Sequence, residues 1–263
     1  MINDIRDQSN CGCCWAFAAV GAASDRMCIT TNGTLTMPLS AQDVCFNSNS
    51  NGCGGGSIDT PWDYMNEDGG EGVVTGGQYQ GSGPFGQGYC SDFSLPHCHH
   101  HGPTKGDPYP PEGILTGCPK KFSPRGPKRC DKTASSEHSN FDDDKYVYKG
   151  RPSTALFEHD IKQFIMEGGP CEAAFTVYSD FENYDTGIYH HVTGKAVGGH
   201  AVRIVGWGVE KGVKYWKVAN SWNKYWGESG FFRIQVGDGD LEAGCIASST
   251  KAVWHKKSQA VVG

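Results

Sequence analysis

A thiol, an imidazole and two carboxamides occur in this sequence with neighbours that suit nucleophilic catalysis. Cys14 lies in segment 8–17, which reads QSNCGCCWAF and places the thiol in the first turn of an expected helix. Unpaired N–H groups and partial positive charge at a helix N-terminus stabilise a thiolate. His200 could accept the thiol proton, and Asn220 could orient the imidazole. Gln8, together with the Cys14 backbone N–H, could then donate hydrogen bonds to an oxyanion.

These residues also have purely structural interpretations. The cysteines of segment 11–14 could belong to a disulfide framework, and a single histidine on a strand is commonly structural. The neighbours of each residue favour chemistry instead. Gly199 lets another backbone approach His200, and the indole of Trp222 could shield the imidazole–carboxamide hydrogen bond from water.

The composition limits the class of protein. With 263 residues, a net charge of −6 and a pI near 5.9, the chain offers no basic face for nucleic acid. Twelve cysteines and 37 glycines indicate a loop-rich, disulfide-supported fold from an oxidising or endolysosomal compartment. Zinc is the competing explanation, but no two Cys-x-x-Cys modules occur at finger spacing. No apolar run reaches transmembrane length and no signal peptide precedes segment 8–17, so if the protein is secreted, this is expected to be a mature or truncated form.

The sequence predicts helices in the first half of the chain and strands mainly in the second half. Apolar spacing predicts a buried helix over 14–28, a short helix capped by Ser40, and an amphipathic helix over 153–167. The long stretch 76–135 lacks periodicity but holds four cysteines, which indicates an ordered excursion. Helices followed along the chain by strands indicate an α+β protein of two lobes. The strand-like runs are 173–178, 200–207, 215–218 and 231–236.

The motifs resemble those of the papain-like cysteine peptidases, and within them the cathepsin B-like branch. The resemblance implies a papain-like fold with a helical left lobe (1–150), a β-rich, barrel-like right lobe (151–263) and an active-site cleft between them. It covers nearly the whole chain: IRDQ at 5–8, CWAF at 14–17, SDR at 24–26, GCGGG at 52–56, YSDF at 178–181, HVTG at 191–194, GGHA at 198–201, VGWG at 205–208 and NSWN at 220–223.

By resemblance, Cys14 is the nucleophile of a cysteine-type peptidase and forms a thioester acyl-enzyme. His200 is its imidazolium partner, Asn220 orients His200, and Gln8 donates to the oxyanion. The implied substrate-binding residues are Gly55, Gly56, Gly199, Trp222, His100 and His101.

The excursion at about 90–130 resembles the cathepsin B occluding loop. His100 and His101 match the histidines that bind a substrate's C-terminal carboxylate, which implies release of C-terminal dipeptides alongside endopeptidase cleavage. Metal binding by residues 99–101 is the rival interpretation, although adjacent loop histidines do not form a preorganised site. Tyr225 replaces an acidic residue that holds this loop in relatives, so a loosely held loop is expected; Asp7 remains and could pair with His100.

The cysteines depart from the family pattern. Cys13 stands where relatives have Ser or Ala, and its thiol could be inert or could form a disulfide with Cys14 or another neighbour. The resemblance implies a Cys11–Cys53 bridge and leaves Cys28 without its usual partner. The remaining pairings stay open: Cys45, Cys90 and Cys98 compete for Cys118 and Cys130, and Cys171 and Cys245 could be free.

The resemblance also bears on the substrate residue P2. Segment 244–250 lacks the glutamate that lets many relatives accept arginine at P2, so apolar P2 residues are expected.

The resemblance also implies partners and a location. These are peptide and protein substrates, a propeptide and cystatin-type inhibitors, with a monomer in a lysosome, in an endolysosomal vacuole or outside the cell. Neither a cofactor nor a resident metal is expected, and the sequon at 32–34 predicts a glycoprotein. The alternative is a catalytically impaired homologue that serves as a peptide-binding or host-interaction module. The presence of Gln8, Cys14, His200 and Asn220 together favours the enzyme.

Overall fold

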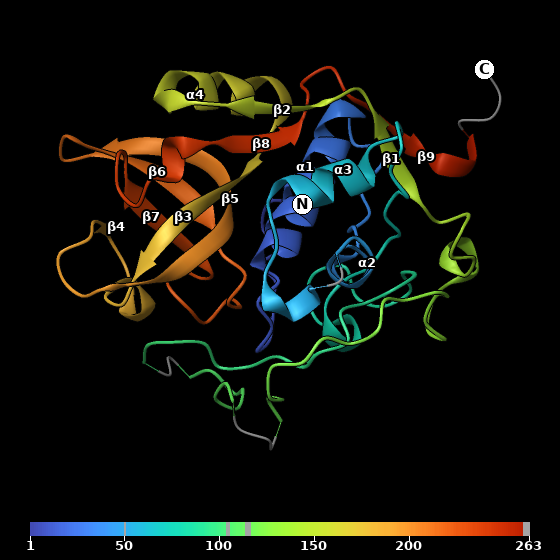
Figure 1. Cartoon of the computed structure of the whole chain (residues 1–263), viewed down its shortest axis with the longest axis horizontal. Coiled ribbons are helices and arrows are strands. Elements are labelled where there is room, and N and C mark those ends of the chain that lie inside the picture. The colour runs from blue at the N-terminus through green and yellow to red at the C-terminus, as the bar shows by residue number, and fades with distance from the viewer. Residues whose placement is uncertain (50, 104–105, 114–116, 260–263) are drawn as a thin grey trace.

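The computed structural model describes residues 1–49, 51–103, 106–113 and 117–259. A group of helices lies beside a twisted sheet, and long loops run below both (Figure 1). The α-helices are α1 (Cys14–Thr30), α2 (Ala41–Asn47), α3 (Asp59–Met65) and α4 (Phe157–Gly168). Short 3-10 turns occur at Gly52–Gly54, Tyr79–Gly81, Ser136–His138, Phe181–Asn183, Leu241–Ala243 and Lys257–Gln259.

Helix α1 is the central helix and carries Cys14 at its first position. Every residue from Trp15 to Met27 is buried, because α1 packs against α2, α3 and the sheet at once. Small alanines allow this close approach on all sides. The structure confirms the predicted helix and extends it to Thr30. The predicted cap of α2 is also confirmed, since Ser40 Oγ accepts from the Asp43 backbone N–H at 3.1 Å.

The strands form an α+β arrangement with the helices, as predicted. Seven strands make one sheet in the order β2-β8-β3-β5-β6-β7-β4. All of its pairs are antiparallel except β4 with β7. The two glycines before His200 fall inside the long strand β5. The bounds are β2 (Pro152–Ala155), β3 (Cys171–Tyr178), β4 (Ile188–Tyr189), β5 (Ala196–Glu210), β6 (Val213–Ala219), β7 (Phe231–Gln235) and β8 (Cys245–Ser248).

A second, two-stranded sheet joins distant parts of the chain. Strand β1 (Tyr146–Lys149) pairs with β9 (Val253–Lys256), beside the helices in Figure 1. The N-terminal segment also pairs with the C-terminal part of the chain, through an isolated antiparallel β-bridge between Asp7 and Trp222. The two predicted lobes therefore exchange short segments, and the boundary at residue 150 stays a prediction.

One element differs from the sequence-based prediction. The helix predicted from Ser153 begins only at Phe157, because residues 152–155 form β2 and pair with β8. The predicted end of this helix is confirmed. Gly169 follows α4 with φ of 100°, a conformation that favours glycine.

Four disulfides cross-link the described chain. The implied Cys11–Cys53 bridge is present, and Cys171–Cys245 ties β3 to β8, so the expectation that these last two could be free was wrong. The excursion is closed by Cys90–Cys130 and Cys98–Cys118. No helix in the described ranges is both long and apolar enough to span a membrane. The cysteines left free are Cys13, Cys14, Cys28 and Cys45.

Candidate functional site

Cys14 is held where the chain turns from an irregular segment into α1. The turn is fixed by the Cys11–Cys53 bridge and by a hydrogen bond from Gly12 N to Cys53 O at 3.1 Å. Burial raises the pKa of the Cys14 thiol, while backbone N–H groups of Ala201 and Trp15 bind the sulfur and oppose this effect. Because Ala201 follows His200 in β5, the sulfur faces the strand that carries the imidazole.

His200 is buried and makes a directed hydrogen bond. Its Nε2 lies 2.7 Å from Asn220 Oδ1, which also accepts from the Ser221 backbone N–H at 2.8 Å. Because a carboxamide oxygen only accepts, this contact assigns the proton to Nε2 and leaves Nδ1 as an acceptor. Burial lowers the pKa of His200 to about 4; the positive charge of His100 adds to the shift, and the Asn220 hydrogen bond opposes it.

An indole covers this hydrogen bond, as expected. The ring of Trp222 stacks on the imidazole of His200, with centroids 4.8 Å apart and an interplanar angle of 27°. Trp222 is only 6% exposed, and Asn220 only 5%. The indole therefore separates the polar contact from water, which strengthens it.

Gln8 is oriented by both of its carboxamide atoms. Its Nε2 donates to Cys11 O at 2.8 Å, and its Oε1 accepts from Ser221 Oγ at 2.6 Å. The Gln8 backbone N–H also donates to Ser221 O at 2.9 Å. Nε2 has a second hydrogen, so one donor remains for a ligand. Ser221 lies within the NSWN motif, but no pattern in the sequence assigned it this positioning role.

The glycines expected to contact a peptide backbone lie on accessible segments. Gly55 has φ of 104°, and a Cβ at this position would meet no atom within 4 Å. A Cβ on Gly56 would lie 2.6 Å from the Trp15 ring, so this position needs glycine for packing. Gly199 is exposed on β5, where a Cβ would also meet nothing within 4 Å.

His100 anchors the excursion at about 90–130, the long loop of this structure, through two carboxylates. Its Nε2 lies 2.7 Å from Asp7 Oδ1, and its Nδ1 contacts Glu112. Burial alone would lower the pKa of His100, but Asp7 and Glu112 raise it to about 10. Burial alone would raise the pKa of Asp7, but His100 and His97 hold it well below its usual range. The His100 imidazolium and the Asp7 carboxylate are therefore both charged near neutral pH.

His101 takes a different position from its neighbour. Its side chain is 33% exposed, its Nδ1 lies 3.7 Å from Glu182, and its ring centroid lies 4.8 Å from that of Trp222. Burial lowers the pKa of His101, although Glu112 and Glu182 oppose the shift. His99 instead contacts Asp107 at 3.1 Å. The three consecutive histidines thus face different partners and do not converge on one point.

The sequence predicted a loosely held loop, but the loop makes further contacts besides the ion pair between His100 and Asp7. Tyr225 packs edge-on against Tyr109 of the loop, with centroids 5.8 Å apart. Asn223 Nδ2 donates to Asp7 Oδ2 at 3.1 Å and to Cys98 O at 2.9 Å. Aromatic packing and a carboxamide therefore supplement the ion pair between His100 and Asp7.

Comparisons with known proteins show what this chain is similar to. The family model described as "Papain family cysteine protease" matches residues 1–253. A cathepsin B-like cysteine proteinase 6 from Caenorhabditis elegans is 41% identical over 257 residues, which cover 95% of this chain and 63% of that protein. A cathepsin B-like cysteine proteinase from Schistosoma japonicum is 42% identical over 258 residues, which cover 93% of this chain and 69% of that protein.

Solved structures show the same fold. Procathepsin B S9 from Trypanosoma congolense aligns with a TM-score of 0.72 at 29% identity, over 93% of this chain and 70% of that chain. Procathepsin L 3 of the Tenebrio molitor larval midgut aligns with a TM-score of 0.60 at 20% identity, over 94% of this chain and 66% of that chain, which supports the fold alone. The chain thus spans roughly two thirds of the length of the proteins it matches (63–70%).

Proposed function

Because the chain belongs to the papain family of cysteine proteases, we propose that it hydrolyses peptide bonds with Cys14 as its nucleophile. One observation carries this proposal: His200 Nε2–H donates a hydrogen bond to Asn220 Oδ1 and leaves Nδ1 free as an acceptor, while the Cys14 sulfur faces the N–H of Ala201. The thiol at the start of α1 and the base on β5 therefore lie on two elements that pack against each other.

The proton moves from the Cys14 thiol to His200 Nδ1. Burial disfavours an isolated thiolate and an isolated imidazolium, so the two charges are expected to form together and stabilise each other. The thiolate attacks a peptide carbonyl, and the oxyanion accepts from Gln8 Nε2 and from the Cys14 backbone N–H. Collapse breaks the C–N bond, and the imidazolium gives its proton to the leaving amine.

Hydrolysis of the thioester restores the thiol. His200 Nδ1 removes a proton from water, the hydroxide attacks the acyl carbon, and the C–S bond breaks to release the carboxylic acid product. The Cys14 thiolate then recovers a proton from His200. Substrate backbone is expected to lie along Gly55 and Gly56, and on the opposite side along Gly199 and Trp222.

The long loop adds a preference for chain ends in this proposal. His101 is the more exposed histidine of the pair and lies against Trp222, where its ring can donate to a substrate's C-terminal carboxylate. His100 can join it when the substrate carboxylate replaces Glu112 at Nδ1. The expected activity is release of C-terminal dipeptides, together with endopeptidase cleavage when the loop moves away.

Paired substrates test this function. A peptide with a free C-terminus and the same peptide with an amidated C-terminus should both be cleaved, the first with the higher kcat/KM. Cys14→Ala should abolish both reactions, and His101→Ala should remove the difference between them. If the folded, reduced protein binds these peptides but leaves them intact, the chain is a peptide-binding homologue and the proposal fails.

The partners and location follow from the same proposal. The matched cathepsin B structure from Trypanosoma congolense is a proform, which supports association with a propeptide. Cystatin-type inhibitors, a monomeric state and a lysosomal, endolysosomal or extracellular location are the corresponding expectations for a peptidase with four disulfides.

A further inference from the structure

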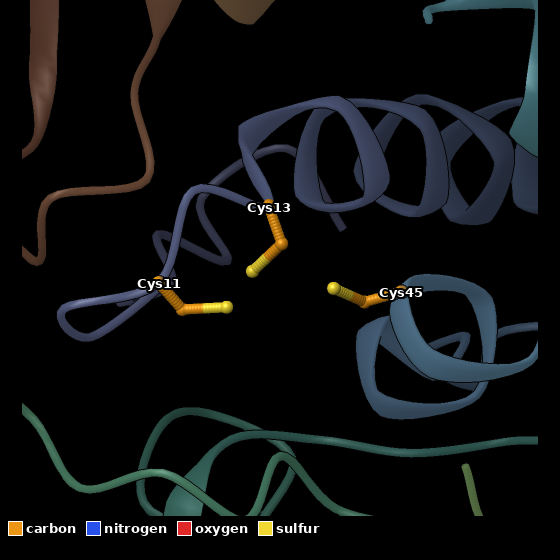
Figure 2. Close-up of side chains that lie close together, drawn as sticks. All are labelled: Cys11, Cys13 and Cys45. Atoms are coloured by element: carbon orange, nitrogen blue, oxygen red, sulfur yellow. The ribbon is translucent and has the colours of Figure 1, made fainter. Parts of the chain in front are cut away.

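Three sulfur atoms meet beneath the N-terminus of α1. The Sγ atoms of Cys11, Cys13 and Cys45 all lie within 4.8 Å of one another, and all three residues are buried. Figure 2 shows the three side chains pointing into one shared space. Cys11 is already bonded to Cys53, whereas Cys13 and Cys45 are free thiols.

The two free thiols lie on neighbouring helical segments. Cys13 immediately precedes α1, and its carbonyl accepts from Ala16 N at 2.9 Å and from Phe17 N at 3.1 Å. Cys45 lies in α2, which packs against α1. Each is 0% exposed. Burial raises the pKa of Cys13, and a hydrogen bond with the Cys45 thiol raises it further. The two thiols are therefore mutual partners.

We propose that Cys13 and Cys45 form a redox pair that closes an additional disulfide between the start of α1 and α2. The oxidant is a low-molecular-weight disulfide such as glutathione disulfide. The inference rests on the sulfur geometry, and it stands whether or not Cys14 is a catalytic nucleophile.

The reaction consists of two thiol–disulfide exchanges. The Cys45 thiolate attacks glutathione disulfide, forms a mixed disulfide and releases a glutathione thiolate, which takes up the proton that Cys45 lost. The Cys13 thiolate then attacks Cys45 Sγ, and the second glutathione leaves with the proton from Cys13. Two protein thiols are oxidised and one glutathione disulfide is reduced. Because both thiols are buried, exchange requires a state in which the α1–α2 contact is open, such as a chain that has not finished folding.

A metal site explains this cluster less well. A structural thiolate site for zinc takes four protein ligands. Here Cys11 is committed to Cys53, so only two thiols remain for an ion. Two neighbouring thiols without further ligands suit disulfide formation better than coordination.

The bridge would fix the segment that leads into Cys14. The Cys13 backbone N–H donates to Cys11 O at 2.8 Å, and the same carbonyl accepts from Gln8 Nε2. A Cys13–Cys45 bond would also remove the thiol beside Cys14, so the two could not form an inactivating disulfide. Since the Cys11–Cys53 bridge already encloses both residues, the added gain in stability should be modest.

The test is disulfide mapping of the full chain across graded ratios of reduced to oxidised glutathione, with urea below the unfolding transition to speed opening. After acid quench and alkylation in denaturant, cleavage after Phe46 separates Cys45 from Cys53, and tandem mass spectrometry identifies each bridge. In oxidising buffer we expect the Cys45 peptide joined to Cys13, with Cys11–Cys53 intact and a Tm increase of about 3–6 °C.

Serine variants supply the controls. Cys45→Ser and Cys13→Ser should each lose both the cross-linked peptide and the Tm shift, whereas Cys28→Ser should keep both. Cys13 and Cys45 alkylated as free thiols at every glutathione ratio would overturn the proposal. A bridge from Cys45 to Cys11 with Cys53 released would also overturn it, and so would a Cys13–Cys14 bridge.

Discussion

His100 Nε2 lies 2.7 Å from Asp7 Oδ1, and neither side chain is more than 1% exposed. The ion pair joins the long loop to the residue that directly precedes Gln8. Asp7 Oδ1 also accepts from Ser9 N at 2.7 Å, and Asp7 Oδ2 accepts from Cys98 N at 3.2 Å. One carboxylate therefore positions both the loop and the segment that carries the proposed oxyanion donor.

Asp7→Asn should weaken the loop and favour endopeptidase cleavage. The substitution leaves the His100 imidazolium with Glu112 alone, and breaking a buried ion pair costs about 3 kcal/mol. We expect a matching loss in the free energy of urea unfolding and a severalfold lower ratio of dipeptide release to endopeptidase activity. Asp107→Asn, which removes the carboxylate beside His99, is the matched control and should leave this ratio near the wild-type value. An unchanged ratio in Asp7→Asn would contradict the anchoring role.

Glu112→Gln should improve the use of substrates with a free C-terminus. Glu112 contacts His100 Nδ1 and so competes with a substrate carboxylate for the same imidazolium. Removing that charge should lower KM severalfold for the free-acid peptide and leave the amidated peptide unaffected. Steady-state kinetics on the matched pair measure this effect. An equal change for both peptides would mean that Glu112 acts on the loop as a whole.

The acid limb of the pH profile should reflect His200. Its pKa of about 4 means that the imidazole becomes protonated below this pH and can no longer accept the Cys14 proton. We therefore expect kcat/KM for an amidated peptide to fall as pH drops through about 4. His100→Gln removes a neighbouring positive charge, so the acid limb should move to higher pH. A limb that stays in place would show that His100 does not influence the base.

Ser221→Ala should lower kcat more than it raises KM. The hydroxyl holds Gln8 Oε1 at 2.6 Å, and one such buried hydrogen bond contributes about 1.4 kcal/mol, which corresponds to about a tenfold loss in rate. The exposed Ser139→Ala serves as the control. A Ser221→Ala variant with wild-type kcat would remove Ser221 from the account of how Gln8 is oriented.

Substrates with apolar P2 residues should be preferred over those with arginine. Segment 244–250 contains no acidic residue, and Glu172, which pairs with Ile246, lies buried with its Oε2 accepting from Trp62 Nε1 at 2.9 Å. Burial raises the pKa of Glu172 well above its usual value, which disfavours the charged form of this carboxyl. A panel that varies only P2 should give a higher kcat/KM for Phe than for Arg, and equal values would contradict the expectation.

The sequence predicted the parts of the site that depend on local pattern. Helical spacing placed Cys14 at the start of α1, and glycine neighbours marked the strand of His200. Long-range pairing was not predictable in the same way. Residues 152–155 form a strand only because β8 lies beside them, and the Cys171–Cys245 bridge depends on that same contact. The partnership of His100 with Glu112 was missed because the loop has no periodicity from which its folding could be inferred.

Labelling with a thiol-reactive peptidyl epoxide tests the central claim most directly. Intact mass and peptide mapping of the reduced, folded protein should show one adduct, on Cys14. The Cys14→Ala variant should show none, although Cys28 remains partly exposed. Labelling that persists in Cys14→Ala, or no adduct on Cys14 in the folded protein, would contradict the assignment of Cys14 as the nucleophile.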